Sequence, residues 1–488
     1  MGTFFSDAFE IDATVIEDYG AFDISLIADL PLFIDPFLLF HSEKLEYQQL
    51  HNSLIDYLVF LRDAAKQRRV SEALLRAWYC FPEVKQTWLG FSLEGNEGHG
   101  LGIDFARSLH ENLHEIFGDF GGERITSGSH LEKVCLIKDG IGRDNISDFV
   151  TNLIKDFLCT YTQEFAQQAL RADQSRLAAV NNAVFNYETE TWQSKRYILP
   201  WFNNDFVLLT PKDMLTRDDT WINRRDLVRS FEEIPAAIPD DQLRAQVSNY
   251  FERVLARAAD REPSHRDYDI AAMRTIREFP DLIDYYIKLK EQRGDDASDI
   301  SSERVRFTEL VFVEQLREIQ HLLKATAFYS TGRNTHQEAY TRLEYLKDVI
   351  ENKGGHRLFY AGNKPIERES DLQVLYRLVW FGTPSDVSTE VNDGRGPADF
   401  KISRGAKDKT IVEMKLAKNT HLRRNLQKQA EIYKKASDAQ DAIKVILFFT
   451  EEEEQRVHEI LQELGMLDNP DIFLIDARSD NKPSGSKA

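Results

Sequence analysis

Apolar and polar positions along the last third of the chain form a pattern that predicts strands flanked by helices. Apolar residues that recur every three or four positions indicate helices, and alternating or short continuous apolar runs indicate strands. In chain order the predicted elements are a helix (366–381), three strands (386–392, 398–403 and 409–417), a helix (423–437) and a buried strand (443–450). A second helix and a short strand follow, up to residue 477.

Upstream of this segment the pattern is mostly helical. Residues 41–67 and 145–170 have helical apolar spacing, whereas 183–211 is typical of strands joined by turns. More helices fill the stretch after residue 240, with a loop predicted at 294–302. We therefore predict a multi-domain α+β fold. Its parts are a mixed α/β N-terminal region (1–235), a helical middle (236–355), a C-terminal domain (356–478) and a disordered polar tail (479–488).

Two charged residues interrupt the apolar strand 409–417. Glu413 and Lys415 are two positions apart, and side chains at i and i+2 of a strand point to the same face. Burying such a pair costs several kcal/mol per ion unless other groups complete the interaction. Asp399 lies on the preceding predicted strand. This grouping indicates a functional site, with an exposed charged hairpin as the structural alternative.

The candidate chemistry of this group is that of a magnesium site. Mg²⁺ prefers oxygen ligands and usually keeps several waters. Asp399, Glu413 and the backbone carbonyl of Met414 would supply the protein ligands, and phosphate and water would complete the shell. A bound divalent ion polarises a phosphate and lowers the pKa of its water. Lys415 would position or help deprotonate that water and would stabilise the negative charge that develops.

The element order, with an acid on the second strand and Glu-x-Lys on the third, resembles the PD-(D/E)xK nuclease superfamily. Its members share an αβββαβ core and include restriction endonucleases, Holliday-junction resolvases and RecB-type nuclease domains. The resemblance covers about residues 366–450 and matches Asp399, Glu413 and Lys415 to the family's motif. This chain has Pro397-Ala398-Asp399 where the motif has Pro-Asp. The resemblance implies a restriction-endonuclease-like core that hydrolyses phosphodiester bonds with Mg²⁺ or Mn²⁺, in DNA rather than RNA.

The resemblance also assigns roles outside the two strands. Gln429 and Tyr433 form the Q-x-x-x-Y pattern of RecB-like members, and their i, i+4 spacing places them on one helix face. Many members carry an acid on the first helix, which would contribute to the metal site. Glu369 is our candidate for that acid, and Glu367 is the second choice.

Charge is unevenly distributed along this acidic chain. The net charge is −20, yet residues 395–435 contain twelve Lys and Arg against four Asp and Glu. A basic segment in an acidic chain is typical of a local phosphate-contacting surface, although a solvated lysine-rich face has the same composition. The candidate nucleic-acid contacts are Arg395, Lys418, Arg423 and Arg424.

Two other function classes stay open. The sequence His110-Glu111-Asn112-Leu113-His114 matches H-E-x-x-H, the pattern of zinc metalloproteases. Glu115 follows the second histidine and no third ligand stands at a familiar spacing, so an amphipathic helix is the preferred interpretation. A nuclease fold that binds nucleic acid or acts as a scaffold without cleaving is the other alternative.

The remaining features bear on location and partners. Three cysteines without metal-ligand spacing, Cys80, Cys135 and Cys159, indicate a reducing compartment. The chain starts without a signal peptide and its longest apolar run, 30–40, is too short to span a bilayer, so we expect a soluble cytoplasmic protein without membrane contact. The N-terminal region is a candidate recognition or regulatory part, as in restriction or antiphage defence. Five apolar residues of the helical middle could belong either to the core or to an interface with a second copy or another partner. They are Leu310, Leu316, Ile319, Leu322 and Leu323.

Overall fold

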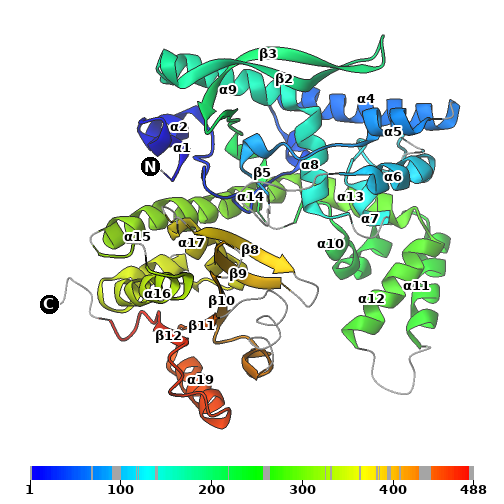
Figure 1. The fold of residues 1–488 in the computed structure, drawn as a ribbon. Helices are drawn as coiled ribbons and strands as arrows, with labels where there is room; N and C mark the ends of the chain where they lie inside the picture. Colours follow the sequence, from blue (N-terminus) through cyan, green and yellow to red (C-terminus); the bar gives the residue numbers. More distant parts are fainter. Residues whose placement is uncertain are drawn as a thin grey trace.

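The fold is mixed α/β, with more residues in helices than in strands and several separate sheets (Figure 1). This confirms the α+β expectation at the level of fold class. The computed structural model describes residues 3–482 except 68–69, 91–100, 117, 119, 138–140, 218, 257–263, 325, 330–331, 362–363, 381–382, 384, 393–396, 406–407 and 428–440.

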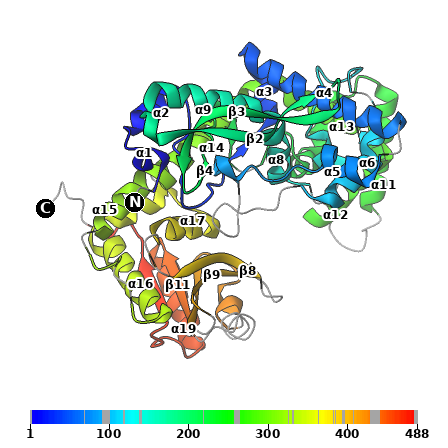
Figure 2. The same cartoon turned by 45° about the horizontal axis from the view of Figure 1, so that its top comes forward.

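The N-terminal region packs helices against a long β-hairpin. Strands β2 (Ser175–Asn186) and β3 (Thr191–Phe202) pair antiparallel, and α9 (Lys155–Ala169) lies along them in both views (Figures 1 and 2). The other helices here are α1 (Phe5–Ala8), α2 (Ala13–Tyr19), α3 (Pro36–His41), α4 (Leu45–Gln67), α5 (Glu72–Tyr79), α6 (Ile103–Ile116), α7 (Lys133–Ile137), α8 (Arg143–Leu153) and α10 (Arg224–Arg229). Short strands are β1 (Phe33–Ile34), β4 (Asp205–Phe206) and β5 (Leu215–Thr216).

Two details of this region differ from the sequence-based expectation. The predicted helix 145–170 is two helices, α8 and α9, which meet at Ile154. Strand β2 begins at Ser175 rather than near residue 183. Ala178 and Ala179 have low strand propensity, but pairing with Tyr197 and Arg196 on β3 holds them in the sheet.

The middle of the chain is helical, as expected. Its helices are α11 (Asp241–Ala256), α12 (His265–Glu278), α13 (Leu282–Gln292), α14 (Gly294–Glu309), α15 (Gln315–Lys324) and α16 (Thr335–Asn352), with a π-helical segment at Leu310–Glu314. Leu316, Ile319 and Leu323 are buried in the main core.

The loop predicted at 294–302 is wrong, because α14 starts at Gly294 and runs through it. Asp295 and Asp296 lie in the first turn, where the helix dipole favours negative charge. Ala297 and Ser301 are buried against neighbouring elements, and this packing outweighs the low helix propensity of the segment.

The C-terminal part contains a five-stranded sheet in the order β12-β11-β10-β9-β8. Strands β8, β9 and β10 form an antiparallel run, and β11 and β12 continue it in parallel with β10. The bounds are α17 (Glu369–Val379), β8 (Asp386–Asn392), β9 (Pro397–Arg404), β10 (Asp408–Leu416), a helical segment at 422–427, β11 (Asp441–Phe448), α19 (Glu451–Glu463) and β12 (Ile472–Asp476). A small hairpin, β6 (Tyr360–Ala361) and β7 (Lys364–Pro365), precedes α17. The predicted strands and flanking helices are confirmed within a few residues wherever the chain is described.

Strand alternation divides this sheet into two faces. Val412, Met414 and Leu416 of β10 belong to the main core, which also includes residues of α15, α16 and α17. The other face packs against the 422–427 segment and α19. Its apolar cluster is Ala417, Leu422, Leu426, Ile446, Phe448, Val457 and Leu461. Glu413 and Lys415 alternate with the core residues and therefore lie on this second face.

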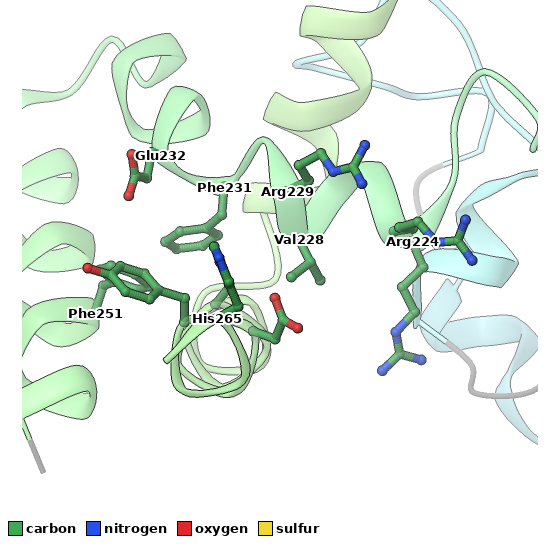
Figure 3. A pocket seen from close by; sticks show the side chains of 11 residues that line it. Arg224, Val228, Arg229, Phe231, Glu232, Phe251 and His265 are labelled. Carbon is green, nitrogen blue, oxygen red and sulfur yellow. The ribbon is translucent and has the colours of Figure 1, made fainter. Parts of the chain in front are cut away.

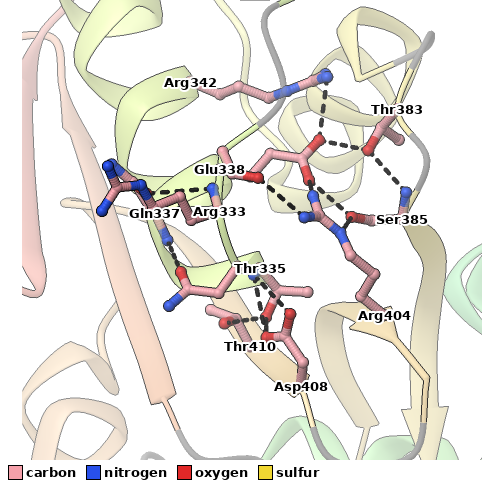
Figure 4. Close-up of polar contacts among 12 residues, drawn as sticks. Arg333, Thr335, Gln337, Glu338, Arg342, Thr383, Ser385, Arg404, Asp408 and Thr410 are labelled. Atoms are coloured by element: carbon pink, nitrogen blue, oxygen red, sulfur yellow. Dashed lines mark hydrogen bonds and ion pairs between the residues drawn. The ribbon is translucent and has the colours of Figure 1, made fainter.

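A buried polar network joins α16 to the core side of the sheet (Figure 4). The Glu338 carboxylate accepts hydrogen bonds from Thr383, from Ser385 Oγ at 2.7 Å and from Arg404 Nη2 at 2.5 Å. Arg342 Nη2 lies 3.2 Å from Glu338 Oε1, and both of these side chains are fully buried. Through Arg404, the network joins α16 to the end of β9.

The start of α16 is fixed to the same strands. Thr335 Oγ1 donates to Asp408 Oδ1 at 2.6 Å, and its backbone N–H donates to the same carboxylate. The hydroxyls of Thr335 and Thr410 are 2.8 Å apart. These contacts hold the beginning of β10, which carries the candidate site at its other end.

Two further findings concern the whole described chain. No helix in it combines the length and the apolar character needed to cross a membrane. The three cysteines are free, with Cys135 and Cys159 buried and Cys80 half-buried.

Candidate functional site

Strands β9 and β10 bring the two predicted acidic positions together along the sheet. Their antiparallel pairing extends to Val412 opposite Phe400. One residue further along each strand come Glu413 and Asp399, so their backbone positions are neighbours. The side chain of Asp399 lies outside the described part of the structure, and its catalytic role stays a prediction.

Glu413 lies beside a buried lysine that the sequence analysis did not single out. The Glu413 residue is 4% exposed and pairs in register with Lys444 of β11, which is 7% exposed. Lys444 Nζ donates to the carbonyl of Leu426 at 2.5 Å. Burial lowers the pKa of Lys444, and the Glu413 carboxylate partly offsets this effect. The second face of the sheet therefore holds a carboxylate and an amine side by side, both largely buried.

Lys415 and the predicted first-helix acid, Glu369, lie together at the end of β10. Lys415 Nζ is 3.6 Å from Glu369 Oε2, and their side chains are 12% and 26% exposed. Glu369 Oε1 accepts hydrogen bonds from Asn419 Nδ2 at 2.7 Å and from the Leu416 N–H at 3.3 Å. Because Glu369 is the first residue of α17, this carboxylate links the helix start to the strand that carries Lys415.

The loop after β10 is held by α19. Arg456 donates from Nη1 to the carbonyl of Ala417 at 3.3 Å and from Nη2 to the carbonyl of Asn419 at 3.0 Å. Asn419 in turn reaches Glu369. Arg456 therefore positions the segment that orients Glu369.

The described basic candidates lie on the surface just beyond the strand. Lys418, Arg423 and Arg424 are exposed. Arg423 forms an ion pair with Glu463 of α19 at 3.1 Å, with both side chains more than half exposed. Arg395, Gln429 and Tyr433 lie outside the described residues, and their predicted roles are not addressed by the structure.

The chemistry of the donor set fits a divalent cation held partly by water. Among the described side chains, no group of three or more His, Cys, Asp or Glu could hold a metal ion. Mg²⁺ does not need such a group, since one or two carboxylates plus substrate phosphate and water suffice. The adjacent strand positions of Asp399 and Glu413, with the Met414 carbonyl between Glu413 and Lys415, offer oxygen donors of the kind that Mg²⁺ or Mn²⁺ takes.

Sequence reasoning missed Lys444, Asn419 and Arg456. Lys444 had a detectable signal, because it is the one charged residue in the apolar run 442–449 and shares the strand setting of Glu413. Asn419 and Arg456 had no such signal in the sequence. Their roles arise from a loop and a helix that meet the sheet only in three dimensions.

The zinc-protease alternative gains nothing from the structure. His110 lies on α6, where its Nδ1 is 3.2 Å from the hydroxyl of Tyr79. Burial lowers the pKa of His110. The side chain of His114 lies outside the described residues. The contact with Tyr79 accounts for His110 as a packed, hydrogen-bonded histidine.

Comparisons with known proteins identify two conserved-domain matches without a known role. Residues 10–223 match a domain of unknown function (DUF8370), and residues 335–451 match a second domain of unknown function (DUF8371). No curated protein and no solved structure gives a significant match. The second match starts at the first residue of α16 and covers α17 and β8–β11, so it includes Glu369, Asp399, Glu413 and Lys415.

Proposed function

We propose that the C-terminal part of this chain is a metal-dependent nuclease that hydrolyses phosphodiester bonds in DNA. The observation that carries the proposal is the placement of Glu413 and Lys415 on one face of β10, beside the backbone position of Asp399 and with Glu369 3.6 Å from Lys415. The order of α17, three strands, the 422–427 helical segment and β11 supports a restriction-endonuclease-like core.

In this proposal Asp399, Glu413 and the Met414 carbonyl hold Mg²⁺ or Mn²⁺. When bound, the ion would polarise the scissile phosphate and lower the pKa of a coordinated water. Lys415 would stabilise negative charge on that phosphate. Glu369 pairs with Lys415 at the end of the strand, and Lys418 and Arg424 extend a cationic surface along which DNA would lie.

The test is cleavage of supercoiled plasmid, linear double-stranded DNA, single-stranded DNA and RNA with Mg²⁺, with Mn²⁺ and with EDTA. We expect the wild type to cut DNA only with a divalent ion, and Lys415→Ala and Asp399→Ala to leave it intact. Lys409→Ala, a lysine at the opposite end of the same strand, is the matched control and should cut normally.

Two outcomes would oppose the proposal. Cleavage by Lys415→Ala and Asp399→Ala at the wild-type rate would place the activity elsewhere. Binding of DNA by the wild type without cleavage of any substrate would favour the inactive, nucleic-acid-binding alternative.

A further inference from the structure

A large pocket lies where α10 meets the first helices of the middle region, away from the five-stranded sheet. It has a volume of about 1040 Å³ and is lined by α10, the 3-10 segment Phe231–Ala237, α11 and α12. Its lining residues fall between positions 224 and 272, in the stretch that neither matched domain covers. The pocket is therefore a feature distinct from the proposed nuclease site.

One end of the pocket is aromatic. Figure 3 shows Phe231, Phe251 and His265 grouped together there. The ring centroids of Phe231 and Phe251 are 4.8 Å apart, and Tyr268 lies 6.3 Å from Phe251. Tyr268 is 39% exposed although it is a large aromatic residue. Such a group presents flat ring surface to whatever enters the pocket.

The other end is cationic. Arg224, Arg225 and Arg229 all come from α10, and Figure 3 shows Val228 between the aromatic group and the labelled arginines. Arg225 pairs with Asp219 at 3.3 Å, with its own side chain 76% exposed. For Arg229, the described residues supply no hydrogen bond or ion pair to the guanidinium. Arg229 is thus an exposed cation at a concave surface, and its planar donors match a phosphate.

We propose that this pocket binds a nucleotide. A ligand that combines a planar ring with an anion matches its two ends, because bases stack on aromatic side chains and arginines bind phosphate. The volume of about 1040 Å³ slightly exceeds the usual range for small-molecule sites, which leaves room for the sugar. Glu232 and Asp269 add carboxylates that would accept hydrogen bonds from sugar hydroxyls or base amino groups.

The site favours a free nucleotide over an extended single strand. Extended strands follow continuous positively charged grooves. Here the cations come from one short helix, and the carboxylates of Glu232 and Asp269 share the same pocket lining. A single nucleotide fills both ends, with its base on the aromatic residues and its phosphates on the arginines. The further phosphates of a longer strand would lie near the carboxylates of Glu232 and Asp269.

The experiment is isothermal titration of the full chain in EDTA, which keeps divalent ions from linking a ligand to the proposed nuclease site. The probes are ATP, GTP, CTP and UTP, with adenosine, tripolyphosphate and a single-stranded oligonucleotide for comparison. We expect at least one nucleotide to bind about tenfold or more tightly than adenosine and tripolyphosphate, because each of these offers only half of the ligand.

Variants of the lining residues test whether the nucleotide binds in this pocket. Arg229→Ala and Tyr268→Ala should each weaken nucleotide binding by about tenfold or more, since each removes a contact to one end of the ligand. Arg274→Ala, an exposed arginine of α12 that does not line the pocket, should stay within about twofold of the wild type. Unchanged melting temperatures would show that these variants fold.

Several results would overturn the proposal. They are the absence of binding by every nucleotide, equal binding of ATP and tripolyphosphate, unchanged affinity in Arg229→Ala, and binding of the oligonucleotide alone. None of these depends on whether the sheet cleaves DNA, so the nuclease proposal would stand or fall separately.

Discussion

Two pairs of charged side chains, Glu338–Arg342 and Glu369–Lys415, lie at opposite faces of the same sheet and differ in their exposure to solvent. On the core face, Glu338 and Arg342 are fully buried and bound by neighbouring side chains. On the second face, the side chains of Lys415 and Glu369 are 12% and 26% exposed at the end of a strand. Buried charge alone therefore does not identify a functional site in this protein. Solvent exposure separates the two pairs.

The largest effect on stability is expected at Glu338. Glu338→Ala leaves the buried Arg342 without its counter-ion, and breaking such a pair costs about 3–5 kcal/mol. Urea unfolding followed by circular dichroism measures this loss. Glu344→Ala, an exposed glutamate on the same helix, should change the free energy of unfolding by less than about 0.5 kcal/mol. Equal stability of both variants would show that the core network contributes little.

Glu369→Gln tests the second face. The amide keeps the shape but removes the negative charge beside Lys415, so the ion pair with Lys415 is lost. We expect DNA cleavage to fall by about ten- to a hundredfold, the scale of a small misplacement of a reacting group. The free energy of unfolding should change far less than in Glu338→Ala. A loss of stability as large as that of Glu338→Ala would show that Glu369 mainly stabilises the fold.

Glu413→Gln should destabilise the fold in a pH-dependent way. Burial holds the pKa of Lys444 below 10.5, so the charged lysine is disfavoured in the folded state and Glu413 stabilises it. Without Glu413 the loss at pH 7 should be about 1–3 kcal/mol. It should shrink as the pH rises through the pKa of Lys444, because the neutral amine no longer needs a counter-ion. Unfolding curves at pH 7 and pH 10 measure the difference, and a pH-independent loss would contradict this pairing.

The smallest effect is expected at the surface arginines. Arg424→Ala should weaken DNA binding several-fold and reduce the slope of log affinity against log salt by about one, as for a lost phosphate contact. Arg423→Ala should weaken DNA binding less, because the Arg423 guanidinium already pairs with Glu463. Filter-binding at several salt concentrations compares the two. An identical slope for Arg424→Ala and the wild type would place the DNA elsewhere.

The C-terminal sheet was predictable because its signals are local. Apolar runs and turn residues set the limits of β8–β11, and the i, i+2 rule placed Glu413 and Lys415 on one face before the fold was known. Asp399 and Glu413 are neighbours because β9 and β10 pair antiparallel, as two strands joined by a short connection can. Family resemblance added Glu369, which the structure places 3.6 Å from Lys415.

Other parts were not predictable because they depend on contacts between distant segments. The polar start of α14 is typical of a loop, and the packing of Ala297 and Ser301 against distant elements favours the helix instead. Arg456 reaches the loop after β10 from a helix almost forty residues later. The pocket between α10 and α12 has no sequence motif, since its arginines and aromatic residues come from separate helices that converge in space.

The most direct test of the central claim is to measure DNA cleavage and unfolding on the same preparation of Lys415→Ala. If the second face is a catalytic site, cleavage with Mg²⁺ or Mn²⁺ should fall by about a hundredfold or more, while the unfolding curve stays close to that of the wild type. Cleavage at the wild-type rate would contradict the claim. So would a loss of stability as large as that of Glu338→Ala, because the lysine would then belong with the structural charges of the core face.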